Sequence, residues 1–139
     1  MLKCLNANGV EYLLIGGYAV GYYGYPRATA DIDIWIAVNP ANANRVASAF
    51  HDFGFKSLTA ELFSEPGKGL RLGNPPLRVE ILTSISGVVF EECYSRVEQV
   101  EIDGIQVSLI GLADLRRNKI AAGRFKDLED VEQLSRRAP

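Results

Sequence analysis

The stretch TADIDIWI, residues 29–36, decides the fold that we expect for this chain. Alternate side chains of an extended strand lie on the same face, so Asp31 and Asp33 point the same way, with Thr29 beside them. The opposite face presents isoleucines to a core, namely Ile32, Ile34 and Ile36. Two neighbouring carboxylates repel each other, and Mg²⁺ is typically held by one or two carboxylates together with substrate phosphates. The stretch therefore indicates either a metal-binding strand or a half-exposed strand whose outer face carries two acids.

The length and composition fit a single domain spanning residues 1–139. Of the 139 residues, 47% are hydrophobic and 23% are charged, as is usual for a globular protein. The net charge of −2 argues against a broad electrostatic surface for nucleic acid. Cys4 and Cys93 have neither metal-ligand nor disulfide spacing, and no apolar run could span a membrane, so we predict a cytoplasmic protein without membrane contact. His51 is the single histidine, which argues against histidine-based catalysis.

A glycine pair lies between an expected strand over 10–15 and an expected short helix over 18–23. Gly16 and Gly17 would let backbone N–H groups approach a phosphate without obstruction by Cβ atoms. The alternative is a tight turn that needs glycine's positive φ angles. Arg27 precedes Thr29 with the strand phase of the aspartates, so its guanidinium is placed to pair with a carboxylate or a phosphate.

A later pair of strands supplies a third acid. Residues 70–72 and 77–82 flank the rigid sequence GNPP at 73–76, which predicts a hairpin. In the second strand Arg78 and Glu80 share one face, while the other face is apolar. If this strand lies beside the strand of Asp31 and Asp33, three carboxylates converge.

The remaining elements are expected to pack around these strands. A helix begins with Asn39 as N-cap and Pro40 as first residue and ends at residue 54, with an inward stripe of Val46, Phe50 and Phe53. We expect a short strand and loop over 55–63, a helix over 84–94, and a hairpin of 97–102 with 105–109 around an Asp-Gly turn.

The helix expected over 112–122 carries a lysine where its pattern asks for an apolar residue. Lys119 shares an inward stripe with Leu112, Leu115 and Ala122. Buried lysines are rare unless they are paired, so we expect Lys119 to reach an acid or a bound phosphate; the alternative is a lysine that extends along the stripe's edge to water. Arg124 follows in a basic link. Asp127 then begins a last helix, as its cap or, less favoured, as a polar residue of the site.

The order of these motifs resembles the nucleotidyltransferase fold shared with DNA polymerase β. That pattern has two small residues, then two acids one residue apart, then a third acid between apolar residues; Gly16-Gly17, Asp31-Ile32-Asp33 and Val79-Glu80-Ile81 match it. Residues 27–33 (RATADID) and 118–130 (NKIAAGRFKDLED) are similar to the AbiEii-like branch, which includes toxins of type IV toxin–antitoxin systems. The resemblance spans residues 16–130. It implies an α/β (α+β) fold in which a mixed central β-sheet is flanked by helices.

The resemblance also implies an Mg²⁺-dependent enzyme that moves NMP from an NTP to a hydroxyl acceptor by a two-metal mechanism. Asp31, Asp33 and Glu80 would be the catalytic metal ligands. The nucleotide-binding candidates, which would face the phosphates, are Gly16, Gly17, Arg27, Thr29, Lys119 and Arg124. An RNA end such as tRNA, a protein or a small molecule could serve as acceptor, and a cognate antitoxin or other partner protein is a further candidate.

Two departures from the family pattern leave other hypotheses open. Tyr18 stands where many relatives carry a serine that can touch the nucleotide phosphates, and we expect no counterpart of the additional helical region of larger AbiEii-like toxins. The second hypothesis is a catalytically inactive domain of the same fold that acts through a partner protein. The third is a generic α/β domain with coincidental acids. For stability, we expect Asp31→Asn to leave the metal-free protein at least as stable, because it removes carboxylate repulsion.

Overall fold

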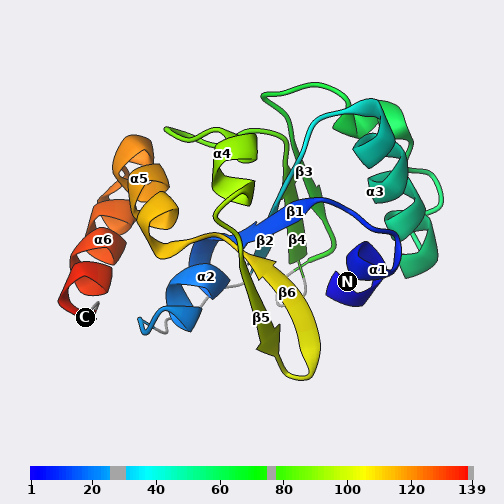
Figure 1. The fold of residues 1–139 in the computed structure, drawn as a ribbon. Helices are drawn as coiled ribbons and strands as arrows, with labels where there is room; N and C mark the ends of the chain where they lie inside the picture. Colours follow the sequence, from blue (N-terminus) through cyan, green and yellow to red (C-terminus); the bar gives the residue numbers. More distant parts are fainter. Residues whose placement is uncertain (26–30, 75–77, 138–139) are drawn as a thin grey trace.

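The computed structural model describes residues 1–25, 31–74 and 78–137, and a six-stranded sheet lies at its centre (Figure 1). The strand order is β3-β4-β2-β1-β6-β5. The strands are β1 (Tyr12–Ile15), β2 (Asp31–Ile36), β3 (Gly69–Leu72), β4 (Arg78–Leu82), β5 (Glu98–Ile102) and β6 (Ile105–Leu109). Two pairs, β2 with β4 and β1 with β6, are parallel, and the other neighbours are antiparallel. The expectation of a mixed central sheet is therefore confirmed.

Helices flank this sheet on both sides. They are α1 (Leu2–Ala7), α2 (Gly16–Tyr22), α3 (Pro40–Phe53), the 3₁₀ turn η1 (Ala60–Phe63), α4 (Phe90–Tyr94), α5 (Leu112–Ala122) and α6 (Phe125–Arg137). In Figure 1, α1 and α3 lie on one side of the sheet, and the packed pair of α5 and α6 lies on the other, with α2 at the same end. None of the helices within the described ranges is long and apolar enough to cross a membrane.

The buried strands follow the hydrophobic pattern of the sequence. All four residues of β1 are buried, and Ile34 and Ile36 on the apolar face of β2 have no exposed surface. These side chains belong to one hydrophobic cluster with Val46 and Phe50 of α3. On the opposite face of β2, Trp35 is also buried in this cluster, whereas Asp31 and Asp33 at the start of the strand are only partly buried. The start of the acid-bearing face therefore remains for the site.

The start of α3 is also as predicted. Asn39 is the N-cap, and its side-chain oxygen accepts a hydrogen bond of 2.8 Å from the backbone N–H of Asn42. Asn42 itself is fully buried, accepts from the backbone N–H of Glu11 and donates to the carbonyls of Glu11 and Ala37. This amide therefore ties the start of α3 to the segment before β1 and the segment after β2.

The end of α3 at Gly54 is as predicted, but the expected inward position of the last helical residue is wrong. Phe53, expected inside, is 42% exposed. Gly54 ends the helix in the left-handed conformation, so the chain reverses and Phe55 lies edge-on against Phe53 at the surface, with ring centroids 6.1 Å apart. Instead of the strand expected within 55–63, the chain forms a loop and then the 3₁₀ turn η1. This path lets Phe63 point inward and stack on Phe50.

The helix expected over 84–94 is shorter than predicted, since only Phe90–Tyr94 is helical. Gly87 has a φ of 78°, which a right-handed helix cannot contain. The carbonyl of Ser86 accepts a hydrogen bond from the side chain of Asn118 in α5, and a Cβ on Gly87 would collide with Ala121 of α5. Residues 84–89 are therefore an irregular segment held against α5.

The two predicted hairpins are confirmed. β3 pairs with β4 in an antiparallel ladder, and β5 pairs with β6 around Asp103 and Gly104, both with positive φ. Cys4 and Cys93 are free thiols, as their spacing indicated.

Candidate active site

The three acids converge because of the strand register. Asp33 lies opposite Glu80 in the parallel pair of β2 and β4, and Asp31 lies opposite Arg78. All three carboxylates can place one oxygen within 4.8 Å of the others. The condition that β4 lies beside β2 is thus met, and this pairing brings acids from two distant segments of the chain into one cluster.

Gly16 closes this cluster from the end of β1. It begins α2 with a φ of 69°, and a Cβ placed on it would lie 2.9 Å from Cγ of Asp33 and closer still to one carboxylate oxygen. Only glycine combines this backbone conformation with so close an approach. Glycine is therefore needed at position 16 chiefly because the carboxylate of Asp33 lies against it. Gly17 is buried behind it and lines the same cavity.

The environment of Asp33 disfavours the ionised form of its carboxyl group. Burial, followed by repulsion from Glu80 and Asp31, raises the pKa of Asp33 to about 6, although Lys119 and Lys126 act to lower it. No described residue forms an ion pair with Asp33. A group that is costly to ionise, set between two other carboxylates, is the environment that a bound cation relieves.

Two arginines that the sequence analysis did not place in the site neutralise the other two acids. Arg78 donates from Nε to Oδ1 of Asp31 at 2.6 Å and from Nη2 to Oδ2 at 3.2 Å. Arg71, on β3 opposite Glu80, donates from Nε to Oε2 of Glu80 at 2.7 Å. Arg78 was visible in the sequence as the residue in phase with Glu80, but the partner of neither arginine follows from the sequence.

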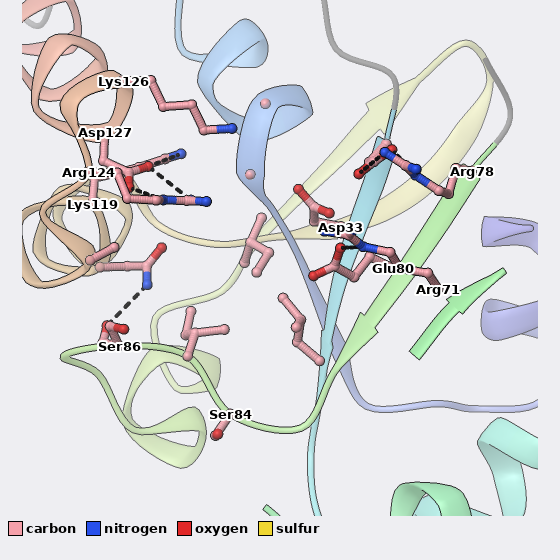
Figure 2. A pocket seen from close by; sticks show the side chains of 18 residues that line it. Asp33, Arg71, Arg78, Glu80, Ser84, Ser86, Lys119, Arg124, Lys126 and Asp127 are labelled. Carbon is pink, nitrogen blue, oxygen red and sulfur yellow. Dashed lines mark hydrogen bonds and ion pairs between the residues drawn. The ribbon is translucent and has the colours of Figure 1, made fainter. Parts of the chain in front are cut away.

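A cavity of about 620 Å³ connects the acids with a wall of cations. Figure 2 shows Asp33, Glu80, Arg71 and Arg78 on the strands at one side. At the other side it shows Lys119 of α5, Arg124 of the link that follows α5, and Lys126 of α6. Gly16 and Gly17 line the space between the two walls. Opposite charges at opposite walls suit a ligand that carries both phosphates and a bound cation.

The cationic wall is built around a buried lysine. Lys119 is 4% exposed, and its Nζ lies 3.1 Å from Oδ1 of Asp127 and 3.3 Å from Oδ2 of Asp130. We expected Lys119 to reach either an acid or a bound phosphate, and the structure shows it paired with two acids. Arg124 grips the same Asp127 through two hydrogen bonds, of 2.6 and 3.3 Å.

The prediction that Asp127 caps the last helix is wrong. α6 already begins at Phe125, so Asp127 lies inside its first turn, fully buried, and lines the cavity. Burial alone would raise the pKa of Asp127, but the hydrogen bonds from Arg124 and Lys119 bring it below its ordinary value. Asp127 thus holds the two cations in place, which a cap signal alone does not reveal.

The irregular segment after β4 contributes residues that the sequence analysis missed. Ser84, Ile85 and Ser86 line the cavity together with Asn118 of α5. The helix expected over 84–94 would have contained them, although Gly87 and the two valines after it disfavour a helix there. Their placement gives the cavity a polar and partly apolar floor between its two charged walls (Figure 2).

Of the remaining candidates, Arg27 and Thr29 lie outside the described residues, so their roles stay predictions. Tyr18, one residue beyond the glycine pair, is 42% exposed.

The donor set fits a magnesium ion. Three carboxylates with oxygens within 4.8 Å offer the hard oxygen ligands that Mg²⁺ prefers, with room in the cavity for water and phosphate oxygens. No histidine or cysteine belongs to this cluster, so its chemistry does not resemble a zinc site.

Comparisons with known proteins identify the family and the fold of this chain. The whole chain, residues 1–139, matches the model of the family described as "Nucleotidyl transferase of unknown function (DUF2204)". A "putative nucleotidyltransferase" from Thermotoga maritima superposes with a TM-score of 0.63 at 19% identity, over 99% of this chain and 89% of that chain. An antigenic nucleotidyltransferase-like protein from Paracoccidioides brasiliensis gives 0.58 at 17% identity, over 96% and 71%. A search of the curated proteins gives no significant match. At these identities the two structures support the fold alone, and the predicted nucleotidyltransferase fold is confirmed.

Proposed function

The chain belongs to the DUF2204 family of nucleotidyl transferases, and on that premise we propose that it transfers a nucleoside monophosphate from an NTP to a hydroxyl acceptor with Mg²⁺ held by Asp31, Asp33 and Glu80. The observation that carries the proposal is the register of β2 against β4, which sets Asp33 opposite Glu80 and beside Gly16. This arrangement supports a two-metal site more specifically than three separate acidic motifs do.

In the proposed site each wall has its own task. Divalent cations bound by the acids would supply charge neutralisation at the attacking and leaving oxygens of an in-line displacement. Gly16 and Gly17 line the cavity beside Asp33, where their backbone N–H groups would face phosphates. Lys119 and Arg124, held by Asp127, would orient the triphosphate from the opposite wall. Arg27 and Thr29 are proposed to assist in nucleotide binding.

The experiment that tests this proposal is calorimetric titration of each NTP, with and without Mg²⁺, into wild type and an Asp31→Ala/Asp33→Ala variant. We expect Mg²⁺-dependent binding that the double variant loses. A matched control removes two exposed acids outside the cavity, Glu61→Ala/Glu65→Ala, and should bind as wild type does. Absence of NTP binding by wild type at millimolar concentration would overturn the proposal.

The identity of the acceptor is a separate part of the proposal. The resemblance of residues 27–33 and 118–130 to AbiEii-like proteins supports tRNA or protein as acceptor and a role in a toxin–antitoxin pair. Incubation with labelled NTP and Mg²⁺, with tRNA or cell protein as acceptor, should label one of the two. Labelling that survives Asp31→Ala/Asp33→Ala would count against the proposed site.

A second candidate function is an inactive domain that binds a partner protein. The observation that favours it is a set of exposed apolar side chains around the turn between α5 and α6, namely Ile120, Phe125 and Leu128, with Phe125 89% exposed. Biological activity retained by the Asp31→Ala/Asp33→Ala variant would favour this candidate over catalysis.

A further inference from the structure

Two of the proposed metal ligands are held by arginine side chains in the structure, and the sheet register sets these pairs up. Arg78 is the cross-strand neighbour of Asp31, and Arg71 is the cross-strand neighbour of Glu80. We propose that Arg78 and Arg71 act as internal counter-ions that compete with the metal for these carboxylates and, once displaced, bind the phosphates of the nucleotide. This inference rests on the proposed function and assigns two further binding residues to that site.

The pair of Arg78 and Asp31 is the more tightly bonded of the two. Its guanidinium bonds both oxygens of Asp31, at 2.6 and 3.2 Å, which is the two-point geometry that arginine forms with carboxylates. The pair is largely removed from water, with side-chain exposures of 29% for Arg78 and 20% for Asp31. Both residues line the cavity, so the guanidinium stands where a cation bound to Asp31 would have to approach.

Arg71 repeats the arrangement more loosely. It holds one oxygen of Glu80, at 2.7 Å, from the edge strand β3, and its side chain is 63% exposed. An exposed single contact of this kind is weak and easily released. Figure 2 shows both arginines extending from β3 and β4 toward the acids.

A divalent cation changes the balance of charges at this wall. A guanidinium and a dication repel each other at the separations that a shared carboxylate imposes. Arg78 bonds both oxygens of Asp31, so a metal ion that takes Asp31 as a ligand must use an oxygen that already accepts from this arginine. Phosphate oxygens match the fork of a guanidinium as well as carboxylates do, so a triphosphate in the cavity offers each arginine a new partner.

Coupling between the ligands follows from this exchange. Metal binding frees the guanidinium groups for phosphate, and phosphate binding draws them away from the metal ligands. By linkage, nucleotide must then raise the affinity for metal by the same factor as metal raises the affinity for nucleotide. Arg78 would thereby offset the charge of Asp31 until both ligands are present.

The opposing interpretation is that Arg78 only orients Asp31 as a ligand. A carboxylate has further lone pairs, so an arginine and a metal can share it. The two interpretations predict opposite changes in metal affinity when the arginine is removed. Loss of a competitor strengthens metal binding in the absence of nucleotide, whereas loss of an orienting partner weakens it.

The test measures Mn²⁺ binding by electron paramagnetic resonance in nucleotide-free protein for wild type, Arg78→Gln and Arg71→Gln. The charge control is Arg45→Gln, on the exposed surface of α3 outside the cavity. We expect Arg78→Gln to bind Mn²⁺ about tenfold more tightly and Arg71→Gln about two- to threefold more tightly, with Arg45→Gln unchanged. Unchanged or weaker binding by Arg78→Gln would overturn the inference.

A second arm adds a non-hydrolysable NTP analogue. Wild type should bind Mn²⁺ more tightly when the analogue is present, and this gain in affinity should be at least fivefold smaller in Arg78→Gln. An equal gain would contradict the proposal that Arg78 moves from Asp31 to the phosphates. Circular dichroism checks folding, and if Arg78→Gln does not fold, the direction of change in Arg71→Gln decides. Failure of wild type and both variants to bind Mn²⁺ would overturn the proposed function, whereas normal wild-type binding with no change in the variants overturns this inference alone.

Discussion

Gly16 and Asp33 meet at the point where β1 ends, and their contact explains two features of the sequence together. The left-handed backbone of Gly16 admits the carboxylate of Asp33, and Asp33 in turn lies against Glu80. The cost of this packing is visible in the pKa of Asp33, which burial and the neighbouring acids raise to about 6. The site therefore contains a charge that the metal-free fold does not compensate with an ion pair from any described residue.

Substitution of Gly16 should damage the site beyond the strain that a positive φ imposes. Gly9 is a matched control, because its φ of 67° equals that of Gly16 within a few degrees and no atom lies within 4 Å of a Cβ built there. We expect Gly9→Ala to cost about 1 kcal/mol and Gly16→Ala about 1–3 kcal/mol more in the free energy of unfolding, measured in urea. Equal losses in the two variants would show that Asp33 moves aside freely.

Neutralising Asp33 should stabilise the metal-free protein. Because folding raises the pKa of this carboxyl, its ionised form opposes folding, so the penalty is absent below about pH 4, grows toward pH 6 and is complete above it. We expect Asp33→Asn to gain about 1 kcal/mol at pH 7.5, after allowance for partial exposure, and to gain little at pH 4.

The same substitution at Asp31 should act in the opposite direction. Asp31→Asn weakens the two-point ion pair with Arg78, so we expect a loss of about 1 kcal/mol in the free energy of unfolding at pH 7.5. Carboxylate repulsion alone predicted a variant at least as stable as wild type. Urea unfolding across pH 4–8 measures whether each variant gains or loses free energy of unfolding relative to wild type. A gain in both would mean that repulsion outweighs the ion pair.

At the scale of elements, α5 and α6 are joined by charges inside their contact. Lys119 of α5 lies between Asp127 and Asp130 of α6, and all three side chains are almost fully buried. Removal of Lys119 takes away the cation that these two buried carboxylates share. Arg124 still bonds Asp127, but disruption of a buried charged network costs far more than loss of a surface pair. The lysine is thus structural as well as placed at the cavity wall.

Lys119→Met should therefore destabilise the protein before any nucleotide is added. We expect a loss of about 2–4 kcal/mol in the free energy of unfolding. Arg117→Gln in the same helix is the comparison, because it removes an exposed partner of Asp114 while Arg96 keeps that acid paired, and should cost no more than about 1 kcal/mol. A loss below 1 kcal/mol for Lys119→Met would leave nucleotide binding as its main role.

At the scale of the whole molecule, the cavity joins two parts that the chain builds separately. The sheet supplies the acids and the α5–α6 pair supplies the cations, with the segment 84–89 fastened to α5 between them. A ligand that contacts both walls must stabilise both parts together.

We expect an NTP with Mg²⁺ to raise the Tm of wild type by about 5–10 °C at roughly 100-fold excess over Kd, since a ligand that binds only the folded state stabilises it by mass action. Hydrogen exchange should slow in β2, β4, α5 and α6 at once. Protection confined to the two strands would exclude the helical pair from the site. The Asp31→Ala/Asp33→Ala variant should show neither effect.

The local features of this chain could be predicted because they depend on neighbours in sequence. Alternation along β2 placed Asp31 and Asp33 on one face, the Asn39 cap and residue 54 bounded α3, and the Asp-Gly turn joined β5 to β6. Phe53, the segment 84–89 and Asp127 were misjudged because packing between elements decides them. The ring of Phe53 lies at the surface against Phe55, and Gly87 packs on Ala121 of α5. Asp127 bonds Lys119 and Arg124 where α5 and α6 meet.

By itself the sequence determined that two acids share a strand face, that a third acid lies on another strand and that a lysine occupies an inward position. Only the tertiary structure decided that β4 pairs with β2 in the register that sets Asp33 against Glu80, and that Arg78 and Arg71 face the remaining carboxylates. A slip of one residue would turn these side chains to the opposite face. Strand pairing between distant segments is chosen by burial of the whole apolar face, which no local pattern encodes.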